Sequence, residues 1–346
     1  MLTLGIETSC DETSVAVVRD GTQVLSNVIS SSKKSFERLA GVIPEEAARQ
    51  QVACMTPVLD AALKEARCTW RDISLIAVTK GPGLLGSLLV GTTSARVLGA
   101  TWGIPVIGVH HTLGHLSSPW LVPAGQPEAG IRFPVLTLSA SGGHTDLWHR
   151  TSHLEGRLIA RTRDDAAGEA FDKGASMLGL PYPGGPSIAA AAEHGDIHLY
   201  DFPMPLHEDA TLDFSFSGLK TSLKYLLRDR SDARDDTRNV AASYEHALCL
   251  HLCDRLGRAL RTHQDIREVH LVGGVSANLH LRTLAADVCR DRRVTLRHPS
   301  AIAYCTDNAA MIAAAGFFLR LEQPDAVDAA FRTVAALPLN DTLSQK

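Results

Sequence analysis

The sequence predicts an α/β protein made of two duplicated domains with a cleft between them. A strand, a polar turn and a returning strand occur at residues 2–18 and again at residues 135–148. A strand, a glycine turn and a helix occur at residues 73–99 and again at residues 269–288. Such repeated units are typical of a duplicated α/β fold. Ligands of these sheets bind at the carboxyl ends of the strands, so the turns there predict the functional site.

The first half is expected over residues 1–130. Short runs of alternating apolar residues, separated by polar turns, predict its strands. Gly81-Pro-Gly83 is a tight turn, and the small residues at 84–99 follow it with a helical period. The strands of this half are predicted at residues 2–6, 14–18, 23–28, 73–79 and 106–109.

The second half is expected over residues 131–324, and it repeats this order of elements. Gly273-Gly274 forms the turn after a buried strand, and a helix starts at Asn278. Residues 325–346 are expected to pack back on the first half. The strands of the second half are predicted at residues 133–138, 145–148, 269–272 and 293–296.

Composition argues against several classes of protein. The formal net charge of −4 is not typical of a chain that grips nucleic acid alone. No apolar run reaches the ~18 residues that span a bilayer, and nothing resembles a signal peptide, so we expect no membrane segment. The seven cysteines form no CxxC pair and are typical of reduced thiols. We therefore expect a cytoplasmic protein.

The turn Ser141-Gly142-Gly143-His144 lies between two predicted strands. Two adjacent glycines expose backbone N–H groups with no Cβ in the way, and the hydroxyl and imidazole add donors. Such a turn can hold phosphate or carboxylate oxygens, although an ordinary turn with a surface histidine is the alternative. The similar polar turn at residues 8–13 favours a triphosphate or an adenylate lying between the two domains.

His111 and His115 are four residues apart at the start of a helix, which places both imidazoles on one face. This spacing suits two ligands of one metal ion. Asp307 stands at the equivalent place in the second half, so a metal site spanning both halves is predicted. The alternative for Asp307 is an ordinary helix N-cap. A His₂Asp set leaves coordination positions open for substrate oxygens.

Two further loops are expected at the cleft. Asp172 lies on a predicted helix before the rigid turn Pro183-Gly184-Gly185-Pro186. Asn278 follows the Gly273-Gly274 turn, which suits an adenine ring or ribose against bare backbone. The alternatives are an exposed Asp172–Lys173 pair and an ordinary strand-to-helix loop.

Together, eight segments resemble the TsaD family, the tRNA adenosine threonylcarbamoyltransferases, in order over nearly the whole chain. They are GIETSCDETSVAVV, GPGLLGSLLVG, HHTLGHL, SGGHTDL, DDAAGEAFDKGASMLGLPYPGGP, FSFSGLKTSL, GGVSAN and CTDNAAMIAAAG. The resemblance implies an actin-like ATPase fold of two duplicated domains. It also implies transfer of a threonylcarbamoyl group from threonylcarbamoyl-adenylate to the N6 amine of the adenine beside the anticodon, with release of AMP. The tRNAs would be those that read codons beginning with A.

The resemblance also implies the site and the partners. One divalent metal ion per subunit, iron or else zinc, would be held by His111, His115 and Asp307. The partners would be tRNA, a TsaB-like paralogue and a TsaE-like ATPase, with the adenylate made by a separate synthase. The positions implied to hold the adenylate are Ala140, Ser141, Gly142, Gly143, His144, Asp172, Gly185 and Asn278.

The chain departs from the family pattern at several positions. Thr112-Leu113 stand where the family usually has Met-Glu, which puts the tuning of the neighbouring histidines in doubt. Ala140 replaces a valine, and Gln51 replaces a histidine. The base that deprotonates the adenine amine is not evident. Its candidates are Asp11 and Glu12, in the first polar turn.

Three alternative functions remain. A small-molecule kinase of the same fold, such as a sugar or acetate kinase, would share the hairpins and the GGVSAN turn but would not need His111 and His115. A metallopeptidase would need HExxH, whereas Thr112 follows His111. A non-catalytic scaffold subunit would not need the intact set of ligands.

Overall fold

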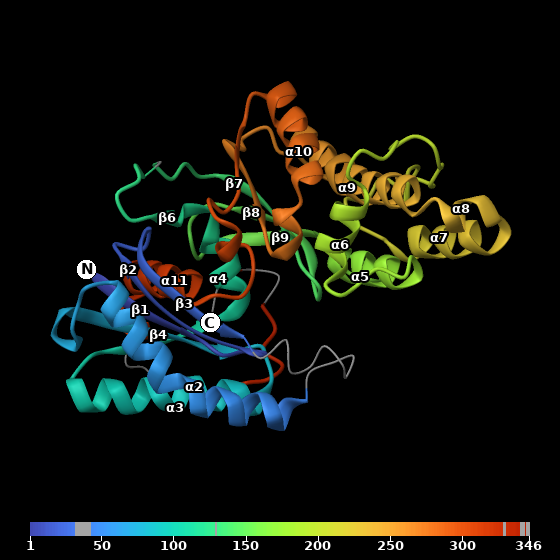
Figure 1. Cartoon of the computed structure of the whole chain (residues 1–346). Helices are drawn as coiled ribbons and strands as arrows, with labels where there is room; N and C mark the ends of the chain where they lie inside the picture. Colours follow the sequence, from blue (N-terminus) through green and yellow to red (C-terminus); the bar gives the residue numbers. More distant parts are fainter. Residues whose placement is uncertain (32–42, 129, 328–329, 340–342, 344–346) are drawn as a thin grey trace. The chain divides into compact units, whose positions relative to one another are not determined.

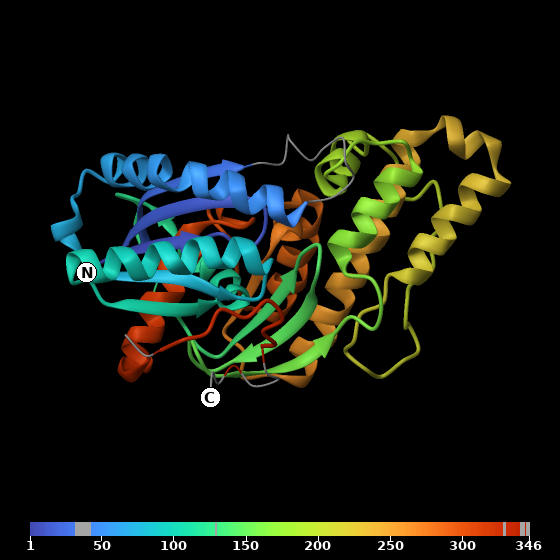
Figure 2. The same ribbon diagram turned by 90° about the horizontal axis from the view of Figure 1, so that it is seen from below.

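The computed structural model describes residues 1–31, 43–128, 130–327, 330–339 and 343. They form two compact units with one mixed sheet each (Figure 1, Figure 2). The first unit comprises Met1–Ile131, Ser152–Glu155 and Pro299–Lys346, and the second comprises Arg132–Thr151 and Gly156–His298. Within the described residues, no helix combines the length and the apolar character needed to cross a membrane.

The sheet of the first unit is built around β1 (Leu2–Glu7). This strand pairs antiparallel with β2 (Glu12–Arg19) and parallel with β4 (Ile73–Gly81). The strand order is β5-β4-β1-β2-β3-β6. The remaining strands are β3 (Gln23–Ser31), β5 (Val106–His110) and β6 (Val122–Pro123).

Helices cover both faces of this sheet, because successive side chains of a strand point to opposite faces. Leu4 and Ile6 pack on one face with apolar residues of α2 and α3, which lie side by side (Figure 1). Gly5 points to the other face, where its missing side chain lets the backbone of α11 approach. The helices of this unit are α2 (Pro44–Glu65), α3 (Leu85–Trp102), α4 (His111–Ser117) and α11 (Ala309–Glu322), with short 3₁₀ helices at Trp70–Asp72, Ser118–Trp120, Ile302–Tyr304 and Pro324–Ala326.

The sheet of the second unit is built around β7 (Val135–Ala140). This strand pairs antiparallel with β8 (Thr145–Arg150) and parallel with β10 (Glu268–Val272), in the order β11-β10-β7-β8-β9. Its apolar core joins the sheet to the helices α5, α7 and α9. The other elements are β9 (Gly156–Arg161), β11 (Thr295–Arg297), α5 (Ala167–Met177), α6 (Gly184–Ala191), α7 (Ser217–Asp229), α8 (Ser231–Asp235), α9 (Thr237–Thr262), α10 (Leu279–Arg292) and a 3₁₀ helix at Gly274–Ala277.

The two sheets confirm the predicted duplication. In each, a hairpin is joined on one side by a parallel strand that follows much later in the sequence. A second parallel strand then extends each sheet, β5 beside β4 and β11 beside β10. The strand β9, which has the place of β3, was not predicted.

The boundary predicted at residue 324 requires correction. The chain returns to the first unit at Pro299, so residues 299–324 belong to that unit. The physical reason is α11, whose small and apolar residues are nearly all buried against the sheet of the first unit. A boundary drawn along the sequence could not anticipate this return.

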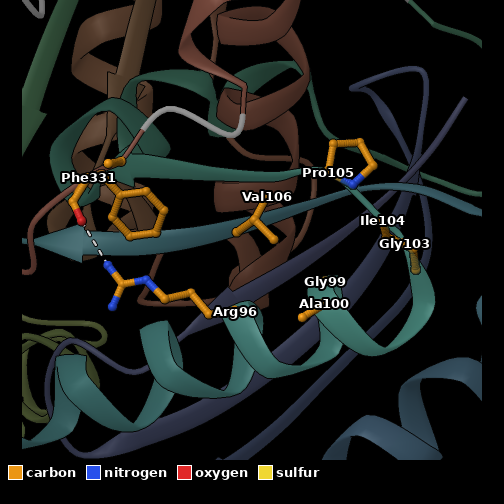
Figure 3. Close-up of a pocket in the computed structure, with 9 residues that line it drawn as sticks. Arg96, Gly99, Ala100, Gly103, Ile104, Pro105, Val106 and Phe331 are labelled. Atoms are coloured by element: carbon orange, nitrogen blue, oxygen red, sulfur yellow. Dashed lines mark hydrogen bonds between the residues drawn. The ribbon is translucent and has the colours of Figure 1, made fainter.

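The described part of the C-terminal segment contacts the β4 and α3 region of the first unit, to which it belongs. The Val334 N–H donates to the Lys80 carbonyl oxygen at 2.8 Å. The Arg96 guanidinium lies 4.7 Å from the centre of the Phe331 ring and donates to the carbonyl oxygen of that residue at 2.7 Å (Figure 3). The pocket beside them, of about 750 Å³, is lined by none of the predicted site residues. Of the predicted segment 325–346, residues 328–329, 340–342 and 344–346 lie outside the described residues.

Gly5→Ala is expected to destabilise the protein by about 3 kcal/mol, because the new Cβ would overlap the Ala309 carbonyl oxygen and push α11 off the sheet. Gly218→Ala is the matched control. A Cβ there meets nothing within 4 Å, and alanine in place of glycine stabilises a helix by about 0.5–1 kcal/mol. Urea unfolding of the three proteins measures both effects. Equal stability of Gly5→Ala and the parent would contradict the close packing of β1 and α11.

Candidate functional site

The three predicted metal ligands lie together in the first unit. His111 is the first residue of α4, directly after β5, and His115 follows one turn later. The Nε2 atoms of His111 and His115 lie 3.5 and 3.1 Å from the same oxygen of Asp307. The ligand atoms of all three residues lie within 4.8 Å of one another. The prediction that Asp307 comes from the other half is wrong, because the chain has already returned to the first unit at that point.

Asp307 is not the N-cap of α11. That place belongs to Asn308, whose side-chain oxygen accepts from the Met311 N–H at 3.1 Å. The carboxylate of Asp307 is therefore left for the two imidazoles. The capping alternative for Asp307 is excluded.

The electrostatics of this cluster suit a bound cation. Burial raises the pKa of Asp307, but the neighbouring His111 and His115 outweigh it and hold that pKa well below its usual range. Burial lowers the pKa of His111, but Glu7 and Asp307 outweigh it and hold that pKa well above its usual range. Carboxylates on two sides of one imidazole thus attract positive charge, which a proton or a metal ion can supply. Nitrogen and oxygen ligands of one metal ion lie about 3–3.5 Å apart, so these residues fit such an ion.

Glu7, which the sequence analysis did not single out, contacts one of the two histidines. Its Oε2 accepts from His111 Nδ1 at 3.0 Å and from the Thr79 hydroxyl at 2.6 Å. Its Oε1 accepts from the Ser9 N–H at 2.6 Å. A carboxylate only accepts, so it fixes the hydrogen on Nδ1 and leaves Nε2 of His111 available as a ligand. The available signal was the position of Glu7 directly after the predicted strand 2–6, beside the predicted strand that ends at Thr79.

The structure shows the surroundings of three positions that depart from the family pattern, Thr112, Leu113 and Gln51. Glu7 supplies a carboxylate to His111 although the family's glutamate is replaced by Leu113, which is buried. Thr112 donates its N–H to His110 Nδ1 at 3.1 Å and so helps to start α4. Gln51 is buried and donates to the carbonyl oxygens of Cys10 and Glu12, both at 3.0 Å.

Asp11 and Glu12, the candidate bases, are buried in and beside the turn between β1 and β2. Burial and these two carboxylates raise the pKa of the Cys10 thiol to about 12. The Ser9 hydroxyl in this turn lies 3.3 Å from His111 Nδ1, so the turn lies close to the candidate metal cluster. The role of either residue as a base stays a prediction.

The Ser141–His144 turn of the second unit connects β7 to β8. The N–H groups of Gly143 and His144 donate to the Ser141 hydroxyl at 3.3 and 3.2 Å. In this conformation, therefore, the hydroxyl occupies two of the donors that the sequence assigned to a ligand. The outer side of the turn is open, since a Cβ at Gly142 or Gly143 meets nothing within 4 Å.

Short contacts join this turn to the other predicted residues of the second unit. The Gly168 N–H, at the start of α5, donates to the Ser141 carbonyl oxygen at 3.0 Å. A Cβ at Gly273 would overlap the carbonyl oxygen of Ala140, so the turn after β10 lies beside the end of β7. These contacts bring three loops together at the carboxyl ends of β7 and β10.

Asp172 and Asn278 both have partners within the protein. Asp172 accepts from the Gly184 N–H at 2.7 Å, while burial raises its pKa. Lys173 instead contacts Asp165 and Glu169, so the plain pair of Asp172 with Lys173 is excluded. A Cβ at Gly185 meets nothing within 4 Å.

Asn278 is the N-cap of α10. Its side-chain oxygen accepts from the Leu281 N–H at 2.8 Å, and its Nδ2 donates to Glu245 at 2.5 Å. One hydrogen on Nδ2 remains for a ligand. Glu245, a buried carboxyl on α9, was not singled out from the sequence.

The family is decided by comparison with known proteins. The family model described as TsaD, tRNA N6-adenosine threonylcarbamoyltransferase, matches residues 23–314. The chain belongs to this family. It is 43% identical over 339 residues to the tRNA N6-adenosine threonylcarbamoyltransferase of Geobacillus kaustophilus, covering 97% of this chain and 96% of that protein. It is also 43% identical over 319 residues to the enzyme of the same name from Bacillus subtilis, covering 91% of this chain and 90% of that protein.

Solved structures agree on the fold of this TsaD-family member. HypF of T. kodakarensis matches 94% of this chain over 48% of its own length, with a TM-score of 0.60 and 14% identity. Component A of the Acidaminococcus fermentans (R)-2-hydroxyglutaryl-CoA dehydratase matches 92% of this chain over 97% of its own length, with a TM-score of 0.53 and 13% identity. These neighbours have the actin-like ATPase fold, which confirms the predicted fold class.

Glu7→Gln is expected to weaken metal binding by about 10–100-fold, because an amide no longer fixes the hydrogen on His111 Nδ1 by charge. The dissociation constant is measured by competition with a chelating dye. Glu45→Gln, an exposed change on α2, is the matched control and should leave the constant unchanged. Equal constants for Glu7→Gln and the parent would show that Glu7 does not support the metal.

Gly143→Val is expected to fold as the parent does and to abolish the binding of AMP. The added side chain points into open space in the protein, where we expect the phosphate. Calorimetric titration with AMP measures the loss, and Gly143→Ala should give an intermediate affinity. Parent-like AMP binding by Gly143→Val would show that the Ser141–His144 segment is an ordinary turn.

Proposed function

We propose that this protein transfers the threonylcarbamoyl group from threonylcarbamoyl-adenylate to the N6 amine of the adenine beside the anticodon. The tRNAs are those that read codons beginning with A, and AMP is released. The observation that carries this proposal is 43% identity along 97% of the chain to an enzyme named for this transfer. The converging ligands His111, His115 and Asp307 support it further, because a kinase of this fold would not need them.

Iron is the metal that we propose for this cluster, with zinc as the alternative. Two imidazoles and one carboxylate suit either ion and leave open coordination positions. The bound ion would supply a Lewis acid toward the phosphate and carbonyl oxygens of the donor. Glu7 keeps the hydrogen of His111 on Nδ1, so that Nε2 stays a ligand.

The loops of the second unit are proposed to bind the adenylate. Ser141 to His144 would hold its phosphate, because the glycines leave the outer side of that turn open. Asp172 would accept from the ribose hydroxyls, and the free Nδ2 hydrogen of Asn278 would donate to the base or its ribose. Ala140 and Gly185 would contribute backbone at these loops.

The reaction is an acyl transfer with a simple balance. The adenine N6 attacks the carbonyl carbon of the mixed anhydride, a C–N bond forms, and the C–O bond to phosphate breaks. AMP leaves with the electron pair of that bond, and the amine proton passes to a base. Asp11 and Glu12 are proposed for this base, since Asp11 lies in the turn between β1 and β2 and Glu12 begins β2, and this turn contacts His111 through the Ser9 hydroxyl.

We propose that a TsaB-like paralogue and a TsaE-like ATPase assist this protein in the cytoplasm. Affinity for tRNA comes largely from neutralised phosphates, and the chain has a formal net charge of −4. Partners would supply the missing positive surface. The free thiols of all seven cysteines are in keeping with a reducing compartment.

The test is a transfer assay with synthetic adenylate and one tRNA, read by mass spectrometry of threonylcarbamoyladenosine. The lone chain is expected to bind tRNA weakly and turn over little, and the partners with ATP should restore multiple turnovers. His115→Ala and Asp307→Ala should lower the rate by about 100-fold or more and also lower bound metal. His194→Ala, a change of an exposed histidine, is the matched control.

Three outcomes would each contradict one part of the proposal. Phosphorylation of a small molecule without any modified tRNA would favour a kinase. Full metal occupancy in both variants would show that these residues do not bind the metal. Tight, salt-dependent tRNA binding and multiple turnovers by the lone chain would contradict the need for partners.

A further inference from the structure

The second unit contains another group of two imidazoles and a carboxylate, made by His149, His263 and Asp265. The ligand atoms of these residues lie within 4.8 Å of one another. His149 Nε2 lies 3.1 Å from Asp265 Oδ2, and the two imidazole rings have their centres 5.2 Å apart. We propose that this trio is a second metal site, which binds a divalent transition metal of the zinc class.

The backbone fixes His149 and brings the other two residues to it. His149 lies on β8, an interior strand, where it pairs with Leu136 of β7 and Arg157 of β9. His263 directly follows α9, and its N–H donates to the Ala259 carbonyl oxygen at 2.9 Å. Asp265 follows two residues later, before β10 begins. The ligands thus come from two segments more than 100 residues apart in the sequence.

The connection between α9 and β10 is short and is held at both ends. After Asp265, the Arg267 N–H donates to the Pro134 carbonyl oxygen at 3.0 Å, next to the start of β7. His263 and Asp265 are therefore confined near β8, yet they lie outside regular structure and can adjust to a metal ion. Nitrogen and oxygen ligands of one zinc ion lie about 3–3.5 Å apart, which the His149–Asp265 distance already satisfies.

The chemistry of the ligands also suits a transition metal. Two imidazoles and one carboxylate are the ligand set that zinc, nickel and copper ions accept.

The site should bind more weakly than the cluster at His111. Only Asp265 supplies negative charge here, and the side chain of Asp265 is 55% exposed. The exposed Arg157, which pairs with His149 across β8 and β9, also opposes a cation. Three protein ligands leave the remaining positions to water. A metal here would tie β8 to the α9–β10 connection and stabilise the second unit, without a role in the transfer reaction.

The experiment counts metal ions in the full chain after removal of any affinity tag, because tag histidines would bind the probe. The protein is stripped with a chelator, dialysed and titrated calorimetrically with Zn²⁺. The parent should bind two equivalents, and the double variant His111→Ala/His115→Ala should bind one. Adding His263→Ala to the double variant should remove that equivalent. Adding His194→Ala instead should leave it, since His194 is exposed and outside both groups.

If the double variant does not fold, two further measurements test the proposal. His263→Ala alone should bind one equivalent of Zn²⁺ where the parent binds two. Excess Zn²⁺ should raise the melting temperature of the parent more than that of His263→Ala, because binding to the native state stabilises it. One equivalent in both proteins, or unchanged binding by His263→Ala, would overturn the proposal. Because these readouts need no tRNA or adenylate, they are independent of the proposed transfer activity.

Discussion

The carboxylate of Glu7 is held at the end of β1 by donors from two directions, and the orientation of His111 in the proposed metal site depends on this arrangement. The Ser9 N–H and the Thr79 hydroxyl fix its two oxygens, so that one of them faces His111. Burying this charge is costly unless it is paired and hydrogen-bonded, as it is here. The carboxylate at the end of β1, which is held by a hydroxyl from β4, therefore orients His111.

Small residues carry the second constraint on the first unit. Gly5 of β1 and Gly316 of α11 leave no room for a Cβ, since the nearest atoms of the facing element would overlap it. These two positions bring α11 close to the sheet, and the residue before this helix, Asn308, caps it. Asp307 is thereby presented to α4. The glycines that allow this close packing therefore also fix the position of Asp307, a proposed metal ligand.

The sequence was informative where a pattern is local. Alternation and glycine turns predicted both hairpins and the two parallel strands that extend each of them, and the four-residue spacing predicted that His111 and His115 share a helix face. The residues that it could not supply depend on contacts distant in the sequence. Glu7 meets His111 across 104 positions, and α11 returns to a sheet that was begun at residue 2. The Ser141 hydroxyl accepts from two N–H groups of its own turn, and such competition between side chain and backbone is not visible in composition. Its donation to a ligand stays a prediction.

The return of the chain to the first unit has a consequence for the order of events during synthesis. Translation proceeds at about 5–20 residues per second, so residues 1–131 are synthesised long before α11. Throughout the intervening synthesis of the second unit, the face of the first sheet that carries Gly5 lacks its covering helix. His111 and His115 are present in that nascent chain, but Asp307 is not. The complete set of proposed ligands exists only when the translation of the chain is nearly finished, so all three residues could bind a metal ion only at that late stage.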